Sequence, residues 1–189
     1  MFIFACITLT FVNSQNDSRA YAIHRDVFSG FKAPEYTVYD PSEKNILYRI
    51  ESDYGLTQNI KVIAHPSKQE VGRLEAEVNF VLYKADISTL DRKTNTWDHG
   101  AIQQKYKFAG TLFYIYWHGQ RIKGETKVFS LTTKFYDEYE KLIAEFGRRH
   151  RLAFKRRYDM KIYSNKYPDQ LFLLGLAAYD SFSAAKGKG

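Results

Sequence analysis

One segment of this 189-residue chain concentrates side chains that could bind an anion. Between Arg148 and Lys161 the sequence carries seven Lys or Arg residues and one acid, so this segment supplies +6 of the net charge of +7. Guanidinium and ammonium groups bind phosphate and sulfate through charge-assisted hydrogen bonds. We therefore predict an anion-binding or lipid-binding site with the following residues: Arg148, Arg149, Arg151, Lys155, Arg157 and Lys161.

Alternation along the same segment indicates a strand with one apolar face. Lys155, Arg157 and Lys161 fall on the outer face, whereas Arg156 shares its parity with the core face and is expected to mark a bend or to pair with an internal acid. A second interpretation stays open, in which a solvated outer face is neutralised by the acidic run at 137–140. The residues expected on the core face are Leu152, Phe154, Tyr158, Met160 and Ile162.

The sequence shows no constellation typical of catalysis. Its five histidines are scattered, and the chain has no nucleophile elbow, phosphate-binding loop or dinucleotide fingerprint. The single Cys6 excludes an intrachain disulfide and a cysteine-based zinc site. No nucleic-acid motif frames the basic segment. We expect a protein that is not an enzyme, with no cofactor, metal or nucleic-acid partner.

Two similar strand–turn–strand units position the first part of the chain. Ile46, Tyr48 and Ile50 alternate with polar residues, and a polar turn separates them from the apolar run Tyr36–Tyr39. A second unit follows at 60–75, and its Pro-Ser pair lies 25 residues after the first. The pattern predicts successive antiparallel hairpins.

Further strands are expected downstream, together with one long loop. The segment Asp86–Gly100 is polar and is expected to be a surface connection. The expected strands are Glu77–Tyr83, Tyr106–Trp117, Thr126–Phe135, Leu142–Phe146 and Leu152–Tyr163.

The C-terminal segment Tyr167–Phe182 reads as one helix that begins at Pro168 and Asp169. It is apolar around its whole circumference, and such a helix must be buried on all sides. Its apolar run, Leu171–Ala178, is far shorter than the roughly 20 residues of a bilayer span. We expect no transmembrane span, and instead a sheet that wraps around a central helix.

The hairpin Val38–Ile50 and the passage from Tyr158–Tyr163 into Asp169–Asp180 resemble the superfamily of tubby C-terminal, phospholipid scramblase and LURP-one-related proteins. This resemblance implies a closed antiparallel barrel of about twelve strands around a buried C-terminal hydrophobic helix, at about 169–182. It places the barrel domain at 36–185, after an N-terminal extension at 15–35. The fold class is therefore expected to be mainly β.

The first fourteen residues resemble a signal peptide. An apolar stretch precedes Val12 and Ser14, which fit the −3 and −1 positions of a cleavage site, although no basic residue occurs before Arg19. Cleavage would make the protein secreted. Without cleavage, we expect a cytoplasmic, peripheral membrane protein.

Together these features predict a monomeric, non-enzymatic barrel that binds an anionic surface through its basic strand. The surface could be a phospholipid headgroup, a phosphoinositide or a sulfated glycan. Two alternatives stay open. One is a secreted, lipocalin-like carrier of a small hydrophobic ligand, and the other is a protein-interaction domain.

Overall fold

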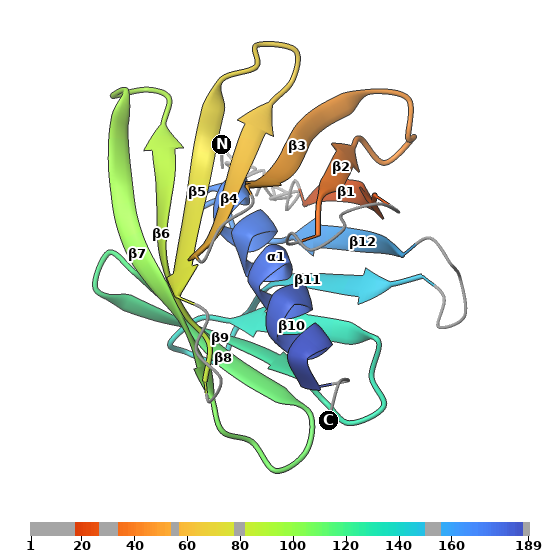
Figure 1. Ribbon diagram of the computed structural model, residues 1–189, viewed down its shortest axis with the longest axis vertical. Coiled ribbons are helices and arrows are strands. Elements are labelled where there is room, and N and C mark those ends of the chain that lie inside the picture. Colours follow the sequence, from red (N-terminus) through yellow and green to blue (C-terminus); the bar gives the residue numbers. More distant parts are fainter. Residues whose placement is uncertain (1–17, 27–33, 54–56, 78–81, 150–155, 187–189) are drawn as a thin grey trace, which may run out of the picture.

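The computed structural model describes residues 18–26, 34–53, 57–77, 82–149 and 156–186 (Figure 1). The predicted signal peptide, 1–14, lies outside the described residues. The strands are β1 (Arg19–Arg25), β2 (Tyr36–Tyr39), β3 (Ile46–Asp53), β4 (Thr57–Ala64), β5 (Glu70–Glu77), β6 (Lys84–Asp91), β7 (Thr96–Lys105), β8 (Thr111–Trp117), β9 (Gln120–Thr126), β10 (Thr132–Tyr136), β11 (Leu142–Arg148) and β12 (Arg157–Ile162), and the helix is α1 (Asp169–Lys186).

The strands form one closed antiparallel barrel, which confirms the predicted fold class. Each strand pairs with its neighbours in sequence, and β1 closes the barrel by pairing with β12 on one side and β2 on the other. β1 lies within the segment 15–35 that we expected outside the barrel. The sequence of β1 lacks the alternation of apolar and polar residues that is typical of a half-buried strand, because the consecutive residues Tyr21, Ala22 and Ile23 are all buried.

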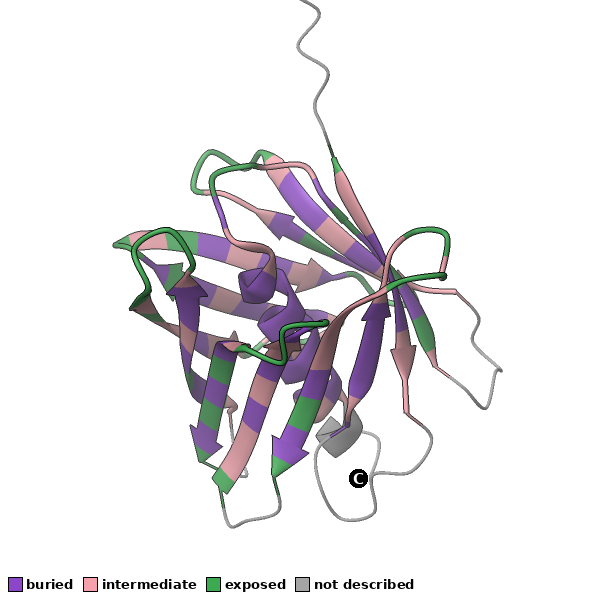
Figure 2. Cartoon of the chain, turned by 90° about the horizontal axis from the view of Figure 1, so that it is seen from above, coloured by how far each residue is buried: buried purple, intermediate pink, exposed green. Residues whose placement is uncertain are grey.

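Helix α1 fills the interior of the barrel (Figures 1 and 2). Its apolar residues from Leu171 to Ala178 are buried on every side, as the all-round apolar pattern predicted. The packing is close, since a Cβ added at Gly175 would lie 3.2 Å from the ring of Phe135. On the barrel wall, the Phe113 ring covers Gly124 so closely that an added Cβ would lie 2.2 Å from it.

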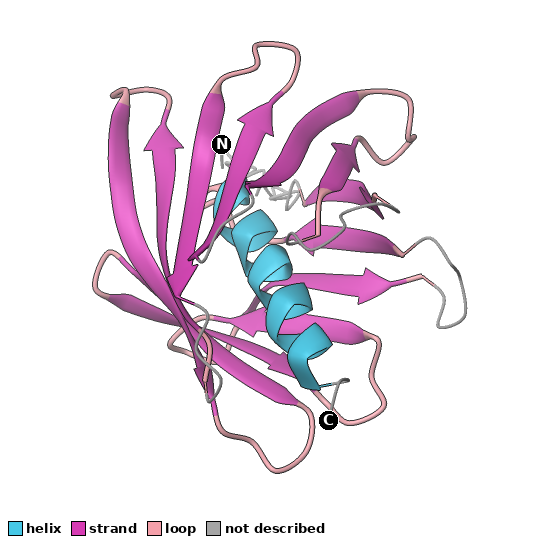
Figure 3. Ribbon diagram, in the orientation of Figure 1, coloured by secondary structure: helices cyan, strands magenta, loops and turns pink. Residues whose placement is uncertain are grey.

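The prediction of a long loop at Asp86–Gly100 was wrong. The structure has strands β6 and β7 there, joined by a short turn at 92–95 (Figure 3). The polar residues occupy the outer face, while the inward positions include Thr89 and Gly100. A polar or small residue at an inward position conceals the alternation that marks a half-buried strand.

Three expected strands also have different limits. Tyr106–Trp117 and Thr126–Phe135 each contain a loop, at 106–110 and 127–131, and β9 between them was not predicted. In the described part of Glu77–Tyr83, Glu77 ends β5 and the remaining residues precede β6. Runs of large apolar residues led to these errors, because the loops themselves carry exposed aromatic side chains.

The two similar hairpins are present as β2–β3 and β4–β5. Glu43 and Lys68, again 25 residues apart, both adopt a positive φ of 58° in their turns. In the first hairpin, the Asp40 carboxylate accepts hydrogen bonds from the Lys44 backbone N–H at 3.0 Å and from the Asn45 side chain at 2.6 Å. The turn is thereby held in a fixed shape, with Glu43 at its tip.

Candidate functional site

The predicted basic segment begins at the last residue of β11 and includes all of β12 except Ile162. Tyr158, Met160 and Ile162 face the core, and Arg157 and Lys161 are exposed on the outer face, so the predicted alternation is confirmed in the described part. Arg148 ends β11 and Arg149 follows it. Arg151 and Lys155 lie outside the described residues.

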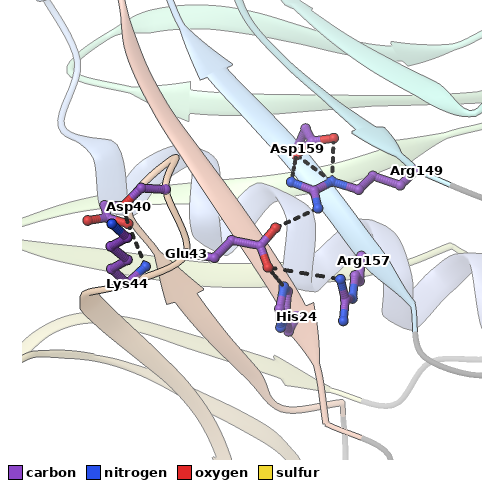
Figure 4. Close-up of polar contacts among 8 residues, drawn as sticks. His24, Asp40, Glu43, Lys44, Arg149, Arg157 and Asp159 are labelled. Carbon is purple, nitrogen blue, oxygen red and sulfur yellow. Dashed lines mark hydrogen bonds and ion pairs between the residues drawn. The ribbon is translucent and has the colours of Figure 1, made fainter.

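Arg149 is engaged by two carboxylates on the outside of the barrel (Figure 4). Its Nε donates to both oxygens of Asp159, at 2.9 and 2.8 Å, and its Nη1 lies 2.5 Å from Glu43 Oε1. The hydrogen bonds to Asp159 and then to Glu43 raise the pKa of the Arg149 guanidinium. Arg149 therefore joins the first hairpin to β12 and has little capacity left for an external anion.

Two further basic side chains from neighbouring strands lie close to Glu43 (Figure 4). His24 Nε2 lies 3.0 Å from Glu43 Oε2, and Arg157 Nη1 lies 3.9 Å from the same oxygen. The hydrogen bond from Arg149 is the largest cause of the lowered pKa of Glu43. We call this set of residues (His24, Glu43, Arg149, Arg157 and Asp159) the surface network.

Partial neutralisation of the basic segment was anticipated, but by other acids. We considered the acidic run at 137–140, whereas the carboxylates that contact Arg149 are Glu43 and Asp159. Within the run, Glu140 pairs with Lys123 instead. No sequence pattern points to Glu43 as the partner of Arg149, because Glu43 lies over a hundred residues away from it in the chain.

Arg156 turns inward and pairs with a buried acid, as one of its two predicted alternatives required. Its Nη1 lies 3.0 Å from Oδ1 of Asp180, a helix residue that is only 3% exposed. The hydroxyls of Tyr36 and Tyr158 donate to Asp180 at 2.7 and 3.0 Å, and Arg25 Nη1 lies 3.3 Å away. We call these five residues the buried network.

Burial shapes the titration of the buried network. Desolvation, followed by the charge of Asp180, raises the pKa of both Tyr36 and Tyr158. Both hydroxyls therefore stay protonated and donate to the carboxylate, which also has two guanidinium partners. A buried carboxylate with four such partners is satisfied, so this network fixes the helix in the barrel and offers no vacant position to a ligand.

A second exposed feature was missed by the sequence analysis. Five of the seven large apolar side chains exposed among the described residues lie in just two loops, at 106–110 and 127–131. The loops are adjacent, because an added Cβ at Gly110 would lie 2.3 Å from the Thr126 carbonyl oxygen. We call the five residues the loop patch: Tyr106, Phe108, Val128, Phe129 and Leu131.

The loop patch lies at the end of the barrel where α1 ends (Figure 1), and it adjoins the basic segment. The Arg148 backbone N–H donates to the Leu131 carbonyl at 2.9 Å. Lys105 precedes the first loop, Lys107 lies within it and pairs with Glu125, and Lys127 begins the second loop. Sequence inspection assigned these aromatic residues to strands, so only the observed exposure reveals the patch.

Two findings bear on the alternatives. Helix α1 occupies the lumen that a lipocalin-like carrier would use for its ligand, which weighs against that interpretation. In the described part of the chain, no helix is both long enough and apolar enough to span a membrane.

Comparison with known proteins gives no independent assignment. No protein-family model matches the chain, and no curated protein matches it. The similarity to tubby and LURP-one-related proteins therefore stays a prediction from the sequence, and the function is inferred from the geometry of the molecule.

Proposed function

We propose that this protein is a non-enzymatic barrel that binds peripherally to an anionic phospholipid bilayer. The loop patch enters the membrane interface, and the neighbouring lysines and the basic segment contact lipid phosphates. The observation that carries the proposal is the pairing of exposed aromatic tips with a cationic rim at one end of the barrel. Such a pairing suits a surface that is both apolar and negatively charged.

The exposed tips favour a bilayer over a glycan, because a sulfated glycan offers nothing apolar to cover them. Phe108 is 95% exposed and Phe129 is 86% exposed. Complete removal of such a side chain from water contributes about 1.5–3 kcal/mol. Each Lys or Arg close to an anionic bilayer adds about 1 kcal/mol.

The backbone at Phe129 supports a functional role for this residue. Its φ is +61°, in the left-handed region that bulky residues seldom adopt and that glycine adopts without strain. The turn is closed by the Ser130 N–H, which donates to the Lys127 carbonyl at 3.1 Å. The turn thus holds a bulky side chain that is 86% exposed in a backbone conformation that favours glycine.

Vesicle co-sedimentation tests the proposal, with phosphatidylcholine vesicles that contain or lack phosphatidylserine. We expect the double variant Phe108→Ser, Phe129→Gly to bind anionic vesicles at least about tenfold more weakly, a loss of about 1.4 kcal/mol. Its thermal stability should be unchanged or higher. The matched control is Tyr139→Ser, since Tyr139 is 82% exposed in the β10–β11 turn at the other end of the barrel.

The charged rim is tested separately. Lys127→Gln should weaken binding to anionic vesicles and reduce its dependence on salt, whereas Lys44→Gln in the first hairpin should do neither. Unchanged vesicle binding by the Phe108/Phe129 variant would refute the proposal. Retention on a heparin column without vesicle binding would instead favour a sulfated glycan as the partner.

A further inference from the structure

A cavity of about 480 Å³ lies at the opposite end of the barrel, where α1 begins. The turn after β6, the turn between β8 and β9, and the segment that leads into α1 enclose it. Its volume falls in the range of small-molecule sites. Leu90, Trp117 and Tyr167 are buried residues that give it an apolar and aromatic wall. We call it the helix-start cavity.

One buried polar side chain on this cavity has no partner. Gln170, in the first turn of α1, borders the cavity and is 8% exposed. Its amide makes no hydrogen bond to any described residue, and its nitrogen and oxygen atoms are not fully covered, so they stay accessible from the cavity. A glutamine amide offers two donors and an acceptor, which are available to a group that enters the cavity.

Gln120, on the same cavity, provides a contrast. Its Oε1 accepts a hydrogen bond of 3.0 Å from the Tyr167 hydroxyl, so its presence is explained by the fold. Gln170 has no comparable explanation, although it lies in a helix whose next eight residues are apolar or glycine. This contrast indicates that the Gln170 amide serves a group that enters the cavity.

The cavity is also positive. The start of a helix carries backbone N–H groups and the positive end of the helix dipole. The carboxylate of Asp169 does not cap these groups, because Arg19 Nε, at 2.8 Å, and the Tyr21 hydroxyl hold it against β1. The Leu171 N–H donates to the Pro168 carbonyl at 3.2 Å, so it is the other N–H groups of the first turn that keep their capacity for an external acceptor.

Three cations border the cavity without an ion pair to any described acid: Arg92, Lys93 and Lys166. Both acids on the cavity wall are engaged locally. Asp91 accepts the Lys93 backbone N–H at 2.8 Å, and Asp98 lies 3.4 Å from Nε2 of His118. The charge balance therefore favours an anion.

We propose that the helix-start cavity binds a small organic anion. Its charged group would contact the start of α1, Lys166 and the Gln170 amide, and its apolar body would pack against Trp117. This site is independent of the loop patch at the other end of the barrel, so either proposal can fail without the other.

Tryptophan fluorescence tests the site, because the chain has only two tryptophans and Trp117 lines the cavity. In a Trp97→Phe variant, Trp117 is the only tryptophan. We expect phenyl phosphate to produce a saturable change in its emission, with an affinity at least about tenfold higher than that of inorganic phosphate. Benzyl alcohol, which has the ring but no charge, should produce no saturable change.

A matched pair of variants separates binding from folding. Gln170→Met should abolish the response to phenyl phosphate and leave the melting temperature unchanged or higher, since it removes a polar group without a partner. Gln120→Met should lower the melting temperature, because it leaves the Tyr167 hydroxyl without its acceptor.

Two results would overturn the proposal. One is the absence of any saturable response in the Trp97→Phe protein. The other is a lowered melting temperature in Gln170→Met together with an unchanged response to phenyl phosphate, which would assign Gln170 to the fold. Equal affinities for phenyl phosphate and inorganic phosphate would overturn the assignment of an organic body.

Discussion

The basic segment supplies Arg156 to the buried network and Arg149 and Arg157 to the surface network, and the two networks differ mainly in burial. Arg156 belongs to the buried network, where Asp180 is almost wholly covered and two tyrosine hydroxyls complete its hydrogen bonds. Arg149 belongs to the surface network, where the Glu43 side chain is 28% exposed. Both unite an acid with arginines, yet only one lies in a low-dielectric interior.

This difference shows that a run of basic residues is not a single functional unit. Arg156 holds the end of the helix, and Arg149 holds a hairpin against the barrel wall. Arg157 and Lys161 remain exposed on the outer face. When Asp180 loses its charge, two buried tyrosine hydroxyls and two partly exposed arginines lose their shared partner, which is costly, whereas an exposed pair exchanges its partner for water.

The largest expected effect is therefore at Asp180. Asp180→Asn removes the charge that Arg25 and Arg156 face, and it leaves a poorer acceptor for two tyrosine hydroxyls. We expect the free energy of unfolding to fall by about 3–5 kcal/mol, measured by urea denaturation. A loss below about 1 kcal/mol would show that the two networks are equivalent in energy and that burial does not distinguish them.

The next effect is a dependence on alkaline pH to which the buried network contributes through its two tyrosines, whereas the surface network contains no tyrosine. Burial raises the pKa of Tyr36 and Tyr158 above the ordinary value of 10.0, so the unfolded chain loses these protons at a lower pH than the folded protein does. Their contribution is fully present below pH 10 and is lost as the pH rises toward the folded pKa values.

We expect the free energy of unfolding to fall above pH 10 by about 1.4 kcal/mol per pH unit for each such tyrosine. Urea denaturation at a series of pH values, with tyrosinate absorbance measured in parallel, tests this expectation. Tyr36→Phe should reduce the slope, and Tyr139→Phe, at an exposed residue, should leave it unchanged. Equal slopes in the two variants would contradict the assignment.

The sequence predicted the elements that have a strong pattern of their own. The all-round apolar helix required burial on every side, and with the strand-rich chain before it this led to the barrel. Arg156, with the wrong parity for an outer position, indicated an internal acid. What the sequence could not show is which distant acid contacts which arginine. Glu43 reaches the basic segment through the closure of the barrel by β1, and Asp180 reaches it through the packing of α1 inside the barrel.

The two candidate sites, the loop patch and the helix-start cavity, were beyond sequence reasoning for a related reason. The sequence does not distinguish an exposed phenylalanine in a turn from a phenylalanine in a strand. Phe108 and Phe129 adjoin apolar runs, so each was assigned to a continuous strand. The isolation of Gln170 is a property of its surroundings. Only the folded chain shows that the Tyr167 hydroxyl donates its hydrogen bond to Gln120 and not to Gln170.

The smallest expected effect on stability is at the surface network. There, a change in vesicle binding also distinguishes the surface network from the buried network. Glu43→Gln removes an exposed acid, so the free energy of unfolding should fall by at most about 1 kcal/mol, and less at high salt. The same change frees Arg149 and Arg157 from one carboxylate.

Because each released cation near an anionic bilayer contributes about 1 kcal/mol, binding of Glu43→Gln to phosphatidylserine vesicles should increase by about fivefold or more. Asp53→Asn serves as the control, since the partner of Asp53 is Lys61 on the distant strand β4. Vesicle co-sedimentation and urea denaturation of the same samples measure both quantities. Weaker vesicle binding by Glu43→Gln would contradict this expectation. It would mean that the arginines of the surface network bind lipid only when Glu43 holds them in place.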